Sequence, residues 1–264
     1  MKKTIIVVES PNDVAFYKKL CSLTRGSKTE DVNAIDIVEF EDLHNFDYDG
    51  KPFRGYSLRC LIAKLQHIKR QLDKDKYQHV NHIAVIVDTD SLPPTNQKPN
   101  REQDGGIENR LYQISKALNE VFNTKLYFEH SREGNIIKTT INLGEETVDY
   151  DFSFSCFLTK NAAGLGNLDY LLKDLASKSA EAHHANCLYI WQECLENKQK
   201  PIKESFLTKL WVDYYIRLDT ASSPEKRDAE IKLNFPDVME NKGEDIFDFS
   251  SILLNPFKEY LSKL

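Results

Sequence analysis

One stretch of the chain, 83–91, limits the possible folds more than any other. It reads I-A-V-I-V-D-T-D-S, five apolar residues that run directly into the carboxylates Asp88 and Asp90. An uninterrupted, mostly β-branched run of this length is typical of a strand that is buried on both faces, as in a parallel sheet covered by helices. The stretch therefore predicts an α/β fold whose central strand ends in two acids.

A second run near the start of the chain has the same form. Thr4 to Val8 is apolar and ends in Glu9, and after S-P the residues from Asn12 onward show apolar positions at helical spacing. We expect a strand, a tight loop and a helix, with Asn12 as the N-cap and Asp13 in the first turn, where the helix dipole favours an acid. A favourable cap position is a sufficient explanation for Asp13, but it does not explain Glu9.

The other hydrophobic patterns complete an α/β order and then change. Strands are predicted at 34–40 and 125–129 and helices at 58–72 and 107–121, while alternation around a Gly-containing turn predicts a β-hairpin over 135–158. Helices follow at 168–175, 182–197, 201–218, 224–233 and 252–264, with a loop at 243–248. We expect a mostly parallel sheet flanked by helices, extended by the hairpin, in a domain over 1–160, with a helical region over 161–264 packed on it.

Composition excludes several classes of protein. The five cysteines are scattered without a C-x-x-C pair, which favours reduced thiols and a cytoplasmic location over a disulfide scaffold or zinc site. The apolar run after M-K-K is too short for a signal peptide, and none approaches the ~20 residues of a membrane span. A net charge of -6 does not support a nonspecific nucleic-acid coat. This net charge is compatible with an enzyme that binds phosphates through metal ions.

Two predicted strands end in acids, and right-handed crossovers allow the strands to be neighbours. Their carboxyl ends would then place Glu9, Asp88 and Asp90 around one volume, at the sheet edge where α/β proteins bind ligands. Mg²⁺ or Mn²⁺ is the expected partner of such oxygen ligands. The alternative is that Asp88 and Asp90 are turn and cap residues that bind their own backbone.

Two further segments could contact an anionic substrate. The polar loop 94–106 would overhang the site and carries Lys98 and Arg101, which could equally be ordinary loop charges. The turn with Gly164 and Gly166 could let backbone approach a phosphate, although a simple strand-to-helix turn explains it as well.

The combination of a strand with V-V-E-S-P and a later strand with V-D-T-D resembles the Toprim domain. Type IA topoisomerases, bacterial primases, small ribonucleases and overcoming-lysogenization-defect nucleases share this domain. The resemblance covers roughly residues 1–130 and implies that Glu9, Asp88 and Asp90 hold Mg²⁺ for phosphodiester chemistry, with Asp13 matching an acid of the nuclease members. The third acid that follows D-x-D in topoisomerases is absent, so the chain is similar to small stand-alone Toprim-like proteins of an uncharacterised family. G-N-L-D at 166–169 could match a G-x-L-E-like turn of that family.

We therefore expect Mg²⁺-dependent hydrolysis or transfer of phosphodiesters in DNA or RNA. Asp88 and Asp90 would hold the metal, with Glu9 as the general acid/base or a further ligand. One alternative is a module that keeps the Toprim fold, has lost catalysis and binds a protein partner. Another is a phosphohydrolase acting on nucleotides or other small molecules.

Overall fold

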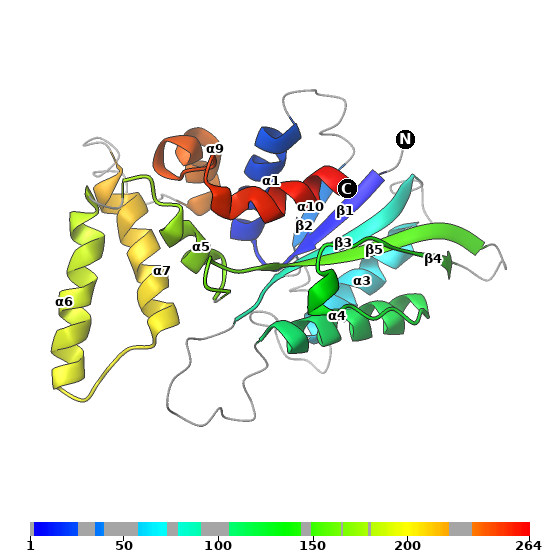
Figure 1. The fold of residues 1–264 in the computed structure, drawn as a ribbon, viewed down its shortest axis with the longest axis horizontal. Coiled ribbons are helices and arrows are strands. Elements are labelled where there is room, and N and C mark those ends of the chain that lie inside the picture. Colours follow the sequence, from blue (N-terminus) through cyan, green and yellow to red (C-terminus); the bar gives the residue numbers. More distant parts are fainter. Residues whose placement is uncertain are drawn as a thin grey trace.

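A five-stranded sheet forms the centre of the molecule (Figure 1). The structure is a computed structural model that describes residues 3–25, 35–39, 58–72, 79–90, 106–143, 149–164, 166–178, 181–221 and 234–264. Its strands are β1 (Lys3–Val8), β2 (Ile35–Glu39), β3 (Val80–Asp88), β4 (Ile137–Asn142) and β5 (Asp149–Thr159), in the order β2-β1-β3-β5-β4. Only β4 runs antiparallel to its neighbour, so the predicted mostly parallel α/β sheet with a hairpin extension is confirmed.

The two strands that end in acids are adjacent at the centre of the sheet. β1 pairs in parallel with β3, with Val7 opposite Val85. Their apolar side chains are buried on both faces, which explains why neither strand shows the alternating pattern of a half-exposed strand. β2, which matches the strand predicted at 34–40, lies at the edge of the sheet.

Two helices cover one face of the sheet. α3 (Leu58–Leu72) and α4 (Ile107–Phe122) pack on each other and on the strands, and their bounds agree closely with those expected from the sequence. Their apolar stripes meet the side chains of Ile5, Val85 and Phe154 in one buried cluster. The helical period of 3.6 residues thus places each stripe on the sheet.

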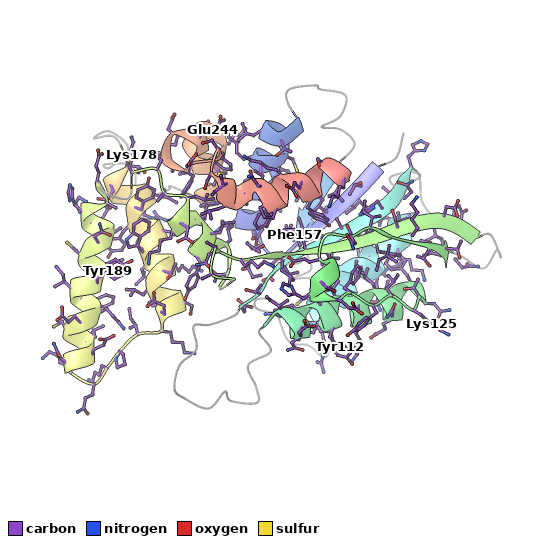
Figure 2. All side chains as sticks on the ribbon, viewed as in Figure 1. Tyr112, Lys125, Phe157, Lys178, Tyr189 and Glu244 are labelled. Carbon is purple, nitrogen blue, oxygen red and sulfur yellow. The ribbon has the colours of Figure 1, made fainter. Side chains whose placement is uncertain are left out.

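Helices from both ends of the chain cover the opposite face. α1 (Pro11–Arg25) packs on β2, on α9 (Phe235–Ile246) and on α10 (Asn255–Lys263). Phe157 of β5 stacks on Tyr260 of α10 at a centroid distance of 4.9 Å, beneath that helix in Figure 2. Thr4 Oγ1 donates to the carbonyl of Leu264 at 3.2 Å. The C-terminal helices therefore share one core with the first strand and helix, while the division at residue 160 stays a prediction.

The remaining helices form a projection at one end of the molecule (Figure 1). They are α5 (Leu168–Asp174), α6 (His183–Asn197) and α7 (Glu204–Tyr214), and α7 continues as the π-helical turn η5 (Tyr215–Asp219). The short 3-10 turns are η3 (His130–Arg132) and η6 (Ile252–Leu254). The helix expected at 182–197 is confirmed, and the one expected from Pro201 begins three residues later, while 224–233 lies outside the described residues. Over the described ranges, no helix is both long and apolar enough to cross a membrane.

Residues 125–129 do not form the predicted strand, so that prediction was wrong. Leu126 and Phe128 are buried and Tyr127 is 62% exposed, which reproduces the alternation of a strand. However, side chains of α4 satisfy the backbone: Asn119 bonds both the N–H and the carbonyl of Leu126, and Ser115 Oγ accepts the N–H of Phe128. The segment therefore needs no neighbouring strand.

Two local predictions also need correction. The segment expected to be a loop at 243–248 is helical as far as Ile246, because Ile246 and Phe247 are buried and hold the last turn of α9 in the core. The N-cap of α1 is Ser10 rather than Asn12: the Ser10 carbonyl accepts the N–H of Val14, and its Oγ accepts the N–H of Asp13 at 3.4 Å. The helix thus begins at Pro11, a favoured first position.

Candidate active site

Glu9 and Asp88 meet at the carboxyl ends of the two central strands. Glu9 Oε1 accepts the backbone N–H of Asp88 at 2.8 Å. The last pair of the β1–β3 register is Val7 with Val85, two residues before Glu9 and three before Asp88, so parallel pairing brings together positions that are far apart in the sequence. Both side chains are half-buried. The expectation that these two strand ends share one volume agrees with this geometry.

Asp13 approaches the same place from the first turn of α1. It is 5% exposed, and its Oδ2 accepts the Ser10 hydroxyl at 2.6 Å. The cap of α1 therefore turns Ser10 toward Asp13 and keeps this carboxylate in the protein interior. A buried acid at a helix N-terminus is favoured by the dipole, but it remains costly without a counter-charge.

The turn before α5 holds the end of β3 in position. The carbonyl of Gly166 accepts both the Thr89 hydroxyl at 2.8 Å and the Asp90 N–H at 2.9 Å. Asp88 Oδ1 in turn accepts the N–H of Leu168 at 3.2 Å. Gly166 has φ +79, and a Cβ there would lie 2.3 Å from Cδ2 of Tyr170, so this position requires glycine.

Asp90 is oriented differently from the other acids. It has φ 48, in the left-handed region that Asp tolerates, and its Oδ2 forms an ion pair with Nη2 of Arg110. The Arg110 side chain is 5% exposed, and its Nη1 also donates to Gln113 Oε1 at 3.1 Å. Asp90 therefore already has a cationic partner.

Mutual repulsion and burial raise the proton affinity of the other carboxylates. Burial, with the charges of Asp13 and Asp90 in support, raises the pKa of Glu9 to about 8. Burial likewise raises the pKa of Asp13 to about 6 against the opposing hydrogen bond from Ser10. For Asp88, burial and then the charges of Glu9 and Asp13 raise the pKa well above its ordinary value. The Arg110 charge opposes this rise at Glu9, but Arg110 forms its ion pair with Asp90. A bound cation would supply positive charge to Glu9, Asp13 and Asp88.

The donor set suits a hard divalent cation, although its present geometry is not that of a formed metal centre. Glu9, Asp13 and Asp88 offer carboxylate oxygens, the ligands that Mg²⁺ prefers. Within the described ranges, however, no three His, Cys, Asp or Glu side chains are placed so that they could hold one ion. Binding would require side-chain rotation, and Asp90 would have to leave Arg110.

A model of one protein family matches residues 3–264, nearly the whole chain. The description of that family is protein of unknown function, DUF3226. The chain belongs to DUF3226. No curated protein and no solved structure matches it.

The predicted substrate contacts of the DUF3226 chain lie in two segments. Lys98 and Arg101 lie outside the described residues. Gly164 has φ +74, and a Cβ there would meet no atom within 4 Å, so it is compatible with close approach of a ligand. The Gly166 carbonyl instead accepts a hydrogen bond from Thr89 just after β3. This contact fits the simple strand-to-helix turn that was the alternative explanation for the two glycines.

Sequence reasoning missed Arg110 and Ser10. Arg110 could have been found from its position, because a cation in the first turn of a helix faces the positive end of the dipole and calls for an anionic partner. Ser10 has a weaker signal, a hydroxyl three residues before an acid at a helix start, which is also an ordinary cap pattern.

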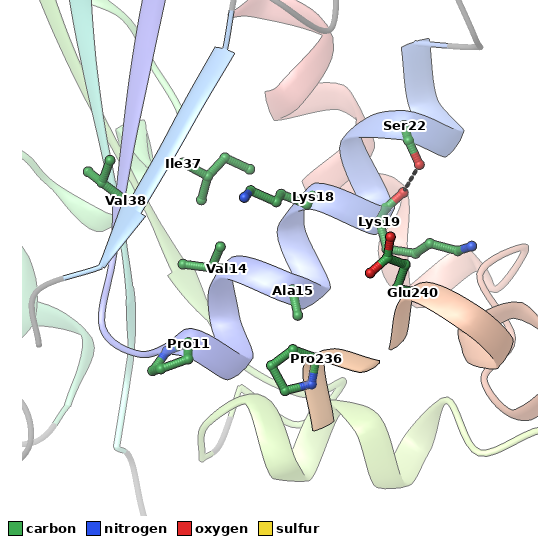
Figure 3. Close-up of a pocket in the computed structure, with 10 residues that line it drawn as sticks. All are labelled: Pro11, Val14, Ala15, Lys18, Lys19, Ser22, Ile37, Val38, Pro236 and Glu240. Carbon is green, nitrogen blue, oxygen red and sulfur yellow. Dashed lines mark hydrogen bonds between the residues drawn. The ribbon is translucent and has the colours of Figure 1, made fainter. Parts of the chain in front are cut away.

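A cavity of about 730 Å³ is lined by residues of α1, β2 and α9. Figure 3 shows it between α1, β2 and α9, with Pro11 at one end and the Lys18 side chain extending toward Ile37. Lys19 lines the cavity too and pairs with Glu244 at 2.5 Å. The volume of the cavity falls in the range of small-molecule sites. Pro11, at one end of the cavity, follows the loop that carries Glu9.

Proposed function

We propose that the protein catalyses Mg²⁺- or Mn²⁺-dependent hydrolysis or transfer of phosphodiesters in nucleic acid, with a Toprim-type acidic site. The observation that carries the proposal is the direct contact between Glu9 and Asp88 at adjacent strand ends, where burial and neighbouring acids raise the pKa of both carboxyls. The resemblance of V-V-E-S-P and V-D-T-D to Toprim sequences supports the same chemistry.

The residues would divide the work as follows. Asp88, with Asp90 once it is released from Arg110, would hold the metal, and Asp13 would contribute from α1. A bound divalent cation polarises a phosphate and lowers the pKa of a bound water. Glu9 would act as a general acid/base or as a further ligand. A carboxyl whose pKa lies near 8 before the cation binds can hold a proton at neutral pH.

Metal binding is the first test. An ion that binds only the folded protein raises its melting temperature, so we expect millimolar Mg²⁺ or Mn²⁺ to stabilise the wild-type chain. Asp88→Asn should abolish the shift, whereas Asp237→Asn, in the first turn of α9 and away from the cluster, should leave it unchanged. Equal shifts in both variants would contradict the site.

Catalysis is tested separately with purified protein. Labelled single-stranded and duplex DNA and RNA are incubated with each metal, and Glu9→Gln and Asp88→Asn should remove any cleavage that the wild type shows. Preference for mononucleotides over oligonucleotides would indicate the small-molecule phosphohydrolase instead. Intact substrates under all metals, together with absent metal binding, would refute the proposal.

One observation favours the second candidate, a Toprim-fold module without catalysis. The buried Arg110 guanidinium occupies the carboxylate of Asp90, one of the two acids of the D-x-D pattern. In such a module the Arg110–Asp90 pair would replace the metal as the counter-charge. Arg110→Met separates the two candidates: a metal-dependent melting shift that grows in this variant favours a metal site, and one that stays absent favours the module.

A further inference from the structure

Arg110 holds a buried positive charge at the edge of the acid cluster. Its side chain is 5% exposed, whereas the side chain of its partner Asp90 is 42% exposed. The guanidinium thus lies on the protein side of the ion pair and the carboxylate on the solvent side. A group that replaced this carboxylate would meet a cation that is already desolvated, and a desolvated cation requires an anion.

Contacts other than Asp90 also fix the position of Arg110. Its Nη1 donates to Gln113 Oε1 at 3.1 Å, one helical turn further along α4. Its backbone N–H donates to the carbonyl of Gly106 at 3.0 Å, in the first turn of the helix. Gln113 is itself buried. The guanidinium should therefore stay in place when the Asp90 carboxylate turns away.

The backbone of Asp90 is held independently of its side chain. The Asp90 N–H donates to the carbonyl of Gly166 at 2.9 Å, and the carbonyl of the preceding Thr89 accepts the N–H of Gly106 at 2.8 Å. Rotation about the side-chain bonds is therefore enough to release the carboxylate from Arg110. The exchange of one anion for another on the guanidinium needs no movement of β3 or α4.

The start of α4 adds to the attraction of an anion at this point. Gly106 is the N-cap, no side chain caps the helix, and the bond from Gly106 to Thr89 places this end of α4 beside Asp90. The positive end of a 16-residue helix therefore lies next to the guanidinium. The charge of Arg110 also reaches the acid cluster, because it opposes the rise in the pKa of Glu9. An anion on Arg110 would thus lie close to the acids that would hold a cation.

A phosphodiester matches this position through its two unesterified oxygens. One of them can accept from the guanidinium, whose planar fork of N–H groups suits phosphate. The other can contact a divalent cation, which polarises the phosphate. Such a group would connect Arg110 with a cation held by the acids.

We propose that Arg110 is a phosphate-binding residue that Asp90 covers until a divalent cation takes the Asp90 carboxylate. Cation and substrate phosphate then bind cooperatively, because the cation holds Asp90 while the phosphate replaces it on Arg110. The identity of the substrate rests on the proposed function, but the exchange of anions on Arg110 can be tested without any metal.

Inorganic phosphate, with a chelator present, is the first probe. Asp90→Asn uncovers Arg110, so phosphate should raise the melting temperature of this variant, with an apparent affinity ~10-fold higher than for the wild type. Adding Arg110→Met to Asp90→Asn should remove this gain. Adding Lys116→Met instead, which removes an exposed cation further along α4, should preserve it. Equal phosphate affinities of the wild type and Asp90→Asn would overturn the inference, and so would an equal effect of acetate at the same ionic strength.

Mn²⁺ binding by the full chain tests the cooperativity with Asp90 in place. The EPR signal of free Mn²⁺ reports how much is bound. Dimethyl phosphate, a diester without a base, should lower the apparent Kd of the wild type for Mn²⁺ by ~10-fold, and that of Arg110→Met by less than about 2-fold. The same reduction in both chains would overturn the inference and leave the metal site standing. Absence of Mn²⁺ binding from both chains, with or without dimethyl phosphate, would contradict the proposed function and the cation-linked exchange with it.

Discussion

Glu9→Gln should stabilise the metal-free protein at alkaline pH. In the wild type, burial and neighbouring acids raise the pKa of Glu9 from 4.5 to about 8, so the folded state holds this proton more tightly than the unfolded state. Stability from this group is then present below pH 4.5 and is lost as the pH rises through 8. Glutamine removes the charge and keeps an oxygen that can accept the Asp88 N–H.

The size of the effect follows from the same pKa. Each pKa unit corresponds to about 1.4 kcal/mol, so the raised pKa of Glu9 sets an upper limit of about 5 kcal/mol on the stabilisation by Glu9→Gln. Because Glu9 is only half-buried in a coupled cluster, solvent reduces this limit to about 2 kcal/mol. For a chain of this length that corresponds to a rise in Tm of about 5 °C at pH 8, shrinking toward zero near pH 5.

Thermal or urea unfolding between pH 5 and pH 8.5, with a chelator present, measures the effect. Glu120→Gln is the control, because Glu120 is exposed on α4 and away from the cluster. Parallel stability curves for Glu9→Gln and the wild type across this range would refute the reasoning. So would a destabilising effect of Glu9→Gln at pH 8.

Two further substitutions test the framework of the site. Asp90→Asn should lower the free energy of unfolding by about 1–3 kcal/mol at neutral pH, because it leaves the buried Arg110 charge without its carboxylate; urea unfolding measures the loss, and an unchanged midpoint would contradict the role of the pair. Gly166→Ala should cost about 2–4 kcal/mol and Gly164→Ala about 1 kcal/mol, since both have positive φ but only the former adds a close contact with a ring; equal losses by the same measurement would argue against that contact.

The sheet and the meeting of Glu9 with Asp88 could be predicted because both rest on strong local patterns. Apolar runs that end in acids identify buried parallel strands, and common connection rules permit the adjacency of β1 and β3 that the structure has. The helix stripes of α3 and α4 are equally strong. Features of the site that depend on individual side chains could not be predicted from such patterns, and the pairing of Asp90 with Arg110 is one example.

The two errors in secondary structure arose where tertiary contacts overrode the local sequence pattern. Residues 125–129 alternate like a strand, yet Asn119 and Ser115 supply their hydrogen bonds from the preceding helix. The acids in the last turn of α9 favour a loop by their local pattern, but the turn is helical because Ile246 is buried in the core. In both segments the tertiary contact outweighs the local pattern.

The route of the chain through its core has a consequence for synthesis on the ribosome. Side chains under α3 and α4 can be enclosed as soon as the first 160 or so positions have emerged, since those helices are encoded between the strands they cover. The opposite surface of β1 must wait for α10, and Leu264, which directly follows that helix, accepts a hydrogen bond from Thr4. The nascent polypeptide therefore displays apolar surface until residues 255–264 have emerged, and such intermediates are natural clients of chaperones.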